Sequence, residues 1–138
     1  MPDASPTEEF HRDHGLRRVG NRLLHPFRRQ EHQVGESAPG HIVVRLSGEI
    51  TSENAARIGA QLQDVLRSHP DVLELDLRRL SHLSSDGGTA FFMTVRAARA
   101  HSTRVIVTHT GHQSRGVLHQ LGLGRVLEVY GEDGSEAP

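Results

Sequence analysis

Two patterns of hydrophobic residues alternate along most of the chain. Segments rich in β-branched or alternating apolar residues, which are typical of strands, occur at 41–46, 72–77, 104–108 and 126–130. Segments whose apolar residues have helical spacing lie between them, at 55–67, 87–100 and 113–121. A short edge strand is also predicted at 31–34, ahead of a Pro39-Gly40 turn.

The boundaries of these elements follow from local signals. Residues 47–50 are predicted to turn the chain, and Thr51 or Ser52 to cap the helix that follows. His69-Pro70 ends that helix, and Gly122 suits a left-handed cap after 113–121. The first helix then presents one apolar face, made of Ala55, Ile58, Leu62, Val65 and Leu66.

The predicted order of elements is β-β-α-β-α-β-α-β. Strands joined through single helices require right-handed crossovers and parallel pairing, whereas the two leading strands form a hairpin. The sequence therefore predicts an α/β fold, with a mixed, largely parallel sheet, a leading hairpin and helices packed on the sheet.

Composition divides the 138 residues into three parts. Residues 1–28 form a basic arm that we expect to be flexible, residues 29–130 form one domain, and residues 131–138 form an acidic tail. Within and just beyond the arm, the stretch 11–29 has six arginines, one aspartate and a weak helical pattern. With aromatic residues at only 4%, the core of the domain must be aliphatic.

Several classes of protein do not fit this chain. The net charge is −1, no apolar run approaches the ~18 residues of a membrane span, and there is no cysteine for a disulfide scaffold. The start of the chain lacks a signal-peptide pattern, so we expect a cytoplasmic protein. Nucleic acid is a weak candidate partner, because the basic stretch 11–29 has one aromatic residue, Phe27, and no known module is present.

The chemistry of the chain is concentrated in residues 81–88, SHLSSDGG, between a predicted strand and a predicted helix. A serine hydrolase is a remote alternative, because a nucleophile elbow needs G-x-S-x-G and this turn is L-S-S-D-G. A zinc site at His109, His112 and His119 is also less favoured than a polar surface, since zinc needs three or four placed ligands. No metal or cofactor is expected.

Three segments, in order, resemble the STAS domain, the fold of the anti-sigma-factor antagonists. VVRLSGEI (43–50) resembles the opening "L-x-G-E-L-D" of that family, and LELDLRRLSHLSSDGG (73–88) resembles its "D-S-S-G" segment. The stretch 104–130 resembles its closing strand, helix, "L-x-x-x-G-L" and strand. The resemblance covers about residues 30–130.

The resemblance implies a phosphoacceptor serine in this turn, which aligns with Ser85. Ser84 then stands where the family has aspartate, Asp86 where it has the second serine, and Thr51 where an aspartate follows "G-E-L". A helix N-terminus suits an attached phosphate, and a partner kinase would supply the base, nucleotide and metal. Asp86 has two further interpretations, as a helix N-cap or as a permanent negative charge beside Ser85.

The function implied by the resemblance is that of a regulatory module, not an enzyme. Its partner would be an anti-sigma factor with serine kinase activity, or a related regulator. The docking turn would comprise Ser84, Asp86, Gly87, Gly88 and Thr89, with the two glycines letting an anion or a partner's backbone approach. The partner-face loop would comprise Gly48, Glu49, Thr51 and Ser52. The alternative is a scaffold or sensor of this fold that works without phosphorylation.

Overall fold

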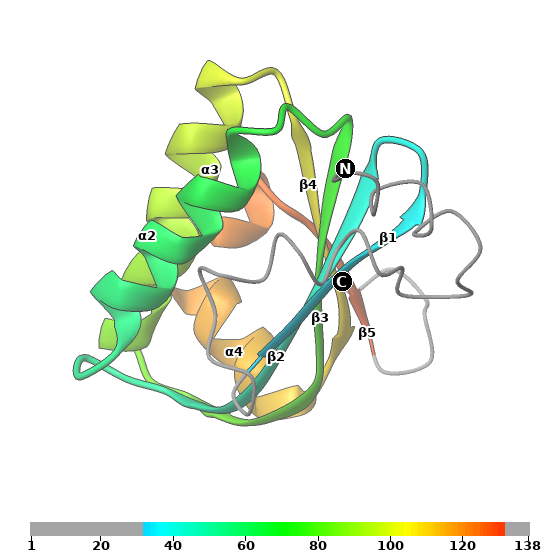
Figure 1. The fold of residues 1–138 in the computed structure, drawn as a ribbon. Helices are drawn as coiled ribbons and strands as arrows, with labels where there is room; N and C mark the ends of the chain where they lie inside the picture. The colour runs from blue at the N-terminus through cyan, green and yellow to red at the C-terminus, as the bar shows by residue number, and fades with distance from the viewer. Residues whose placement is uncertain (1–31, 132–138) are drawn as a thin grey trace.

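The computed structural model describes residues 32–131, and these form one five-stranded sheet with three helices (Figure 1). The predicted arm and acidic tail lie outside the described residues. The strands are β1 (His32–Ala38), β2 (His41–Ile50), β3 (Val72–Leu83), β4 (Arg104–Thr110) and β5 (Glu128–Gly131). The helices are α2 (Ala55–Leu66), α3 (Thr89–Ala100) and α4 (His112–Gln120). Short 3₁₀ turns at Asp86–Gly88 and Leu123–Arg125 complete the set.

The predicted element order and mixed sheet are confirmed. The strand order in space is β1-β2-β3-β4-β5, with β1 and β2 antiparallel and every later pair parallel. Because each crossover joins neighbouring strands with the same hand, the three helices gather on one face of the sheet (Figure 1).

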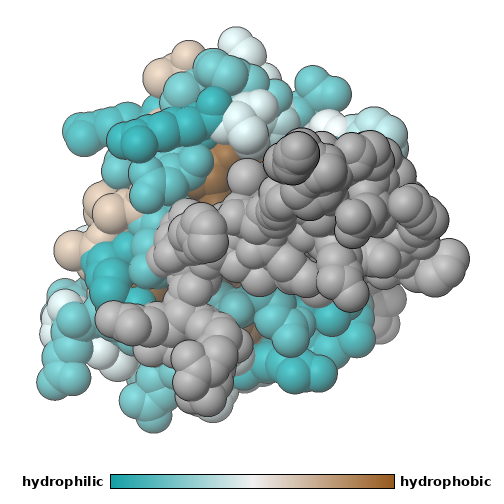
Figure 2. All heavy atoms as spheres, in the orientation of Figure 1, coloured by the Kyte–Doolittle hydropathy of each residue, from teal (hydrophilic) through white to brown (hydrophobic). Residues whose placement is uncertain are grey.

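The core lies between that face and the helices, and it is aliphatic as predicted. Among residues 32–131, Phe91 is the one buried Phe, Tyr or Trp. All five residues of the predicted apolar face of α2 are buried. Gly59 lets α2 approach α3 closely, since a Cβ there would lie 2.5 Å from the sulfur of Met93. The coloured part of the surface in Figure 2 is mostly hydrophilic, with small apolar patches.

The opposite face of the sheet carries polar side chains that bond to one another. Glu74 accepts a hydrogen bond from Thr108 at 2.8 Å and lies 2.9 Å from His41 Nε2. Arg45 and the buried Asp76, which are register partners, form an ion pair at 3.3 Å. The alternation of apolar and polar residues in β2, β3 and β4 therefore matches the two faces of the sheet.

Four strands, β1 to β4, are longer than the sequence predicted, and the difference matters most in β2 and β3. The prediction ended β2 at Leu46 and β3 at Leu77, but residues 47–50 pair with residues 79–83 and extend both strands. The predicted turn at 47–50 is therefore wrong. Gly48, at φ +79°, lies at an irregularity of the ladder, where β3 has one more residue than β2, so this segment continues the strand in place of turning the chain.

No helix among the described residues is long and apolar enough to cross a membrane.

Candidate functional site

The carboxyl ends of β2, β3 and β4 bring three segments together at one edge of the sheet. Ile50 and Leu83 are register partners at the ends of β2 and β3, and the Ser84 amide donates to the Ile50 carbonyl at 2.9 Å. The turn 84–88 therefore begins beside the loop 51–54. These two segments carry most of the residues predicted for the docking turn and the partner-face loop. The amino end of α4, after Gly111, approaches from the other side.

Ser84 organises the turn between β3 and α3. Its Oγ accepts a hydrogen bond from the Gly87 amide at 2.9 Å, and its carbonyl accepts one from the Gly88 amide at 3.2 Å. Thr89 donates from its hydroxyl to the Asp86 carbonyl at 3.0 Å. The turn is thus held by its own hydrogen bonds, and the half-buried Ser84 serves its structure.

The role expected for the two glycines is wrong. Gly87 and Gly88 are buried, so they do not open the turn to a partner or an anion. A Cβ at Gly87 would overlap the carbonyl oxygen of Ile50, and one at Gly88 would overlap the side chain of Leu121. These glycines let the chain pack against itself and place the turn close to the end of β2.

Ser85 is exposed at the start of the 3₁₀ turn that leads into α3. Asp86 and Thr89, which follow it, are exposed too. Within residues 32–131 no side-chain hydrogen bond of Asp86 caps the helix, so the N-cap interpretation of Asp86 is wrong; Ser84 makes the equivalent bond to Gly87.

The predicted partner-face residues lie beside this turn, in two different settings. Gly48 and Glu49 belong to the end of β2, whereas Thr51 and Ser52 begin the loop. Thr51 or Ser52 was expected to cap α2, but the helix begins later, at Ala55, with Asn54 at its N-cap position.

Asn54 fixes this loop and was not singled out by the sequence. Its Oδ1 accepts from the Thr51 amide at 2.9 Å, and its Nδ2 donates to the Glu49 carbonyl at 2.9 Å. The Thr51 hydroxyl accepts from the Glu53 amide at 3.2 Å. An Asn three residues after a Thr, before an apolar helical run, is a local signal that could have indicated it.

Gln113 of α4 is the second residue that the sequence did not indicate. Its Oε1 accepts from the Leu83 amide at 2.9 Å, and its Nε2 donates to the Leu83 carbonyl at 2.7 Å. The β3–β4 ladder ends at the pair Asp76–Thr108, so one side chain takes the place of a strand partner at the end of β3. This contact, 30 residues apart in sequence, positions the residue that precedes the turn.

Three exposed acidic residues belong to the segments that meet at this edge. Glu49, Glu53 and Asp86 are all exposed, from β2, the loop and the turn. His82 is exposed as well, opposite Glu49 in the ladder. The edge therefore presents hydroxyl groups and carboxylates together with the exposed imidazole of His82.

A serine hydrolase or a metal site would need a specific geometry at this edge. Across residues 32–131 no hydrogen bond joins a histidine to Ser84 or Ser85, and the Ser84 hydroxyl is engaged with Gly87. The same residues contain no group of three or more His, Cys, Asp or Glu side chains arranged to hold a metal ion.

Among residues 32–131, perturbed pKa values occur away from this edge, at an ion pair between β4 and β5. The Arg104 guanidinium donates to both carboxylate oxygens of Glu128, at 2.5 and 2.6 Å. These hydrogen bonds lower the pKa of Glu128 and raise that of Arg104.

Comparisons with solved structures give the same fold. A structure described as an anti-sigma factor antagonist from Mycobacterium paratuberculosis is 26% identical, with a TM-score of 0.62, covering 72% of this chain and 83% of that one. The Bacillus cell fate determinant SpoIIAA in its phosphorylated form is 23% identical, with a TM-score of 0.55, covering 74% and 93%. A sulfate transporter family protein from Wolinella succinogenes is 19% identical, with a TM-score of 0.57, covering 70% and 81%.

The comparison with curated proteins gave no match. The family model described as "Mlab, STAS domain" matches residues 34–128, the stretch that runs from β1 to the start of β5. Its match agrees with the resemblance seen in the sequence, and this chain belongs to the STAS domain family.

Proposed function

We propose that this STAS domain is an anti-sigma-factor antagonist that docks a kinase-type anti-sigma factor, or a related regulator, through the carboxyl edge of its sheet. The docking surface comprises the turn residues Ser84, Ser85, Asp86 and Thr89 and the neighbouring residues Gly48, Glu49, Thr51 and Ser52. The observation that carries this proposal is the exposed Ser85 hydroxyl on a turn whose neighbours are fixed by Ile50, Gln113 and Ser84.

In this proposal Ser85 is the phosphoacceptor. The hydroxyl is accessible to another protein, and the domain needs no catalytic base because the kinase supplies base, nucleotide and metal. A phosphate would add about −1.5 to −2 charges beside Asp86, at an edge that also carries Glu49. That change would alter the electrostatic match to a partner without requiring the fold to move.

Support for this class of function comes from two sides. The structural relatives include a protein described as an anti-sigma factor antagonist and one described in a phosphorylated form. In this chain the serine that aligns with the phosphoacceptor is also the exposed one, whereas Ser84 is occupied by the Gly87 amide.

The test is intact-mass spectrometry after incubation with the serine-kinase anti-sigma factors of the same organism and ATP. We expect one added phosphate, lost in Ser85→Ala and kept in Ser81→Ala, an exposed serine at the end of β3. An undiminished mass gain in Ser85→Ala would exclude Ser85 as the acceptor.

A second candidate is a STAS scaffold that binds its partner without phosphorylation. Relative to the family motif, this chain has serine at position 84 in place of aspartate and aspartate at position 86 in place of serine. This exchange favours the scaffold, because Asp86 already places one negative charge beside Ser85. Binding of a purified anti-sigma factor with equal affinity by the wild type and by Ser85→Ala, with no mass gain in ATP, would support the scaffold.

A further inference from the structure

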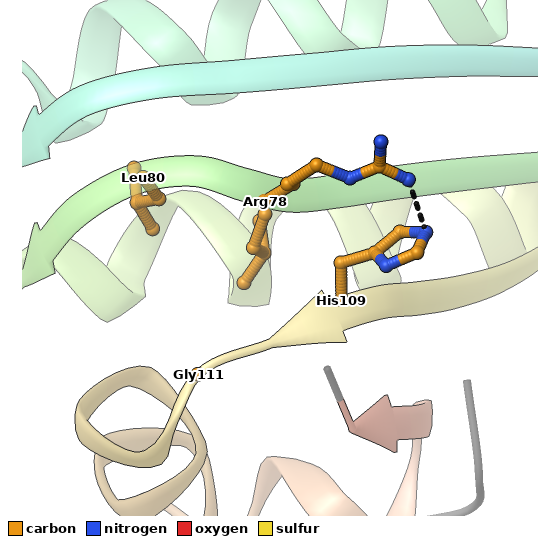
Figure 3. A pocket seen from close by; sticks show the side chains of 5 residues that line it. Arg78, Leu80, His109 and Gly111 are labelled. Carbon is orange, nitrogen blue, oxygen red and sulfur yellow. Dashed lines mark hydrogen bonds between the residues drawn. The ribbon is translucent and has the colours of Figure 1, made fainter. Parts of the chain in front are cut away.

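A cavity opens between β3 and β4, beyond the last pair of their ladder. The ladder ends at Asp76 and Thr108, and the cavity begins immediately after it. Its volume is about 400 Å³, and it is lined by Leu77, Arg78, Leu80, His109 and Gly111 (Figure 3). A space of this size matches that of a small-molecule site.

The cavity results from an irregularity in β3. Arg45 pairs with Asp76 and Ser47 with Arg79, so β3 has one more residue than β2 across this stretch. The Asp76 carboxylate accepts a hydrogen bond from the Arg78 amide at 2.9 Å, which stabilises the bulged backbone. Since a bulge bends its strand and ends pairing, β3 continues along β2 and separates from β4.

Two side chains, the guanidinium of Arg78 and the imidazole of His109, supply the polar groups among the described residues that line the cavity. The Arg78 guanidinium donates from Nη2 to Nε2 of His109 at 2.9 Å (Figure 3). A guanidinium can only donate, so His109 accepts at Nε2 and carries its proton on Nδ1. Among the described lining residues there is no carboxylate, and the exposed Arg78 has further N–H groups that can bind an anion.

The backbone of His109 is strained at this place. Its φ is +54°, a left-handed conformation that costs a non-glycine residue energy and that recurs at functional sites. His69 and Ser102 share a positive φ, but they lie in turns between a helix and a strand. His109 instead lies within β4, with its ring at the cavity, and the next pairing of β4 with β5 is shifted.

We propose that this cavity binds a small organic acid. The carboxylate would pair with the guanidinium fork of Arg78 next to His109, and the apolar body would lie against the half-buried Leu80. The place agrees with the general rule that α/β sheets bind ligands at the carboxyl ends of their strands. The sequential strand order offers no switch point here, so the bulge in β3 supplies the crevice.

The test uses benzoate as the probe, with its uncharged analogue benzamide, in ¹H–¹⁵N NMR titrations of the full chain. We expect saturable shifts centred on Arg78, Leu80, His109 and Gly111. Benzamide and the variant Arg78→Gln should each weaken binding by about tenfold or more, because both remove the charge-assisted pair.

The matched control is Arg79→Gln, which removes an adjacent exposed arginine that does not line the cavity. It should leave the benzoate affinity unchanged. His109→Asn is a second variant, since Asn tolerates the left-handed conformation and lacks the ring; it should also weaken binding, and the same spectra show whether each variant is folded. Absence of saturable shifts at the cavity, equal binding of benzamide, or equal losses in Arg78→Gln and Arg79→Gln would overturn the proposal.

Discussion

The side-chain amide of Gln113 hydrogen-bonds both backbone polar groups of Leu83, at 2.9 and 2.7 Å. Leu83 is fully buried and is the last residue of β3 before the Ser84 turn. One side chain of α4 therefore supplies hydrogen-bond partners for the backbone N–H and C=O at the end of β3. The same contact helps to position the turn that carries Ser85.

Replacing Gln113 with alanine should destabilise the domain and loosen the turn. The loss leaves a buried N–H and a buried C=O without these partners, which costs about 1–3 kcal/mol. Urea denaturation measures the free energy of unfolding, and hydrogen exchange at Leu83 reports the local effect. Gln120→Ala, an exposed glutamine at the end of the same helix, is the control and should change little.

Gly87→Ala should destabilise the domain by about 1–3 kcal/mol, because the new Cβ overlaps the backbone oxygen of Ile50, which has little room to move. Gly116 provides the contrast. It lies within α4 with open space around it, so Gly116→Ala should raise stability by about 0.5–1 kcal/mol. If both alanine variants unfold at the same urea concentration as the wild type, the packing described for Gly87 is incorrect.

Alanine substitutions at Ser84 and Ser85 should differ in their effect on the free energy of unfolding. Ser84→Ala removes the acceptor of the Gly87 amide and should cost about 1 kcal/mol, as loss of a cap does. Ser85→Ala removes an exposed hydroxyl and should change stability by less than about 0.5 kcal/mol. Thermal and urea unfolding of both variants test this, and a larger loss in Ser85→Ala would reverse the assignment.

Glu128 should contribute an acid-sensitive part of the stability. Hydrogen bonding to Arg104 lowers its pKa in the folded state, so the contribution is present above the unfolded pKa of roughly 4.3 and is lost as the pH falls through the lowered value. Glu128→Gln should therefore be less stable than the wild type near neutral pH, by a small amount since both groups are partly exposed. The difference should disappear in acid.

Urea denaturation as a function of pH measures this effect. Glu53→Gln removes an exposed carboxylate that has no ion pair among the described residues, and it should not change the pH profile in the same way. A constant offset between Glu128→Gln and wild type at every pH would contradict an electrostatic origin. High salt should reduce the offset near neutral pH.

The parts of the structure that depend on local pattern could be predicted from the sequence. Helical spacing identified the buried face of α2, and Gly122 has the left-handed conformation expected of it, at φ +78°. The exposed position of Ser85 before a helix was predicted as well. Each depends on residues within a few positions of one another.

The parts that depend on contacts between distant segments could not. Ser47 and Gly48 have the composition of a turn, but they pair with β3 because that strand is long enough to meet them. The glycines Gly87 and Gly88 were assigned to a partner, whereas their neighbours are Ile50 and Leu121. His82 is exposed because β3 extends beyond β4 there, which no local pattern could indicate.

The order of the strands in the sheet has a consequence for how the domain assembles. Every strand is hydrogen-bonded to the strand before or after it in the chain, so none has to be inserted between two that are already paired. The sheet can grow outward one strand at a time, each step closing a loop that contains at most one long helix. Folding should therefore start from the long β2–β3 pair and spread to both edges, with the short β5 joining last.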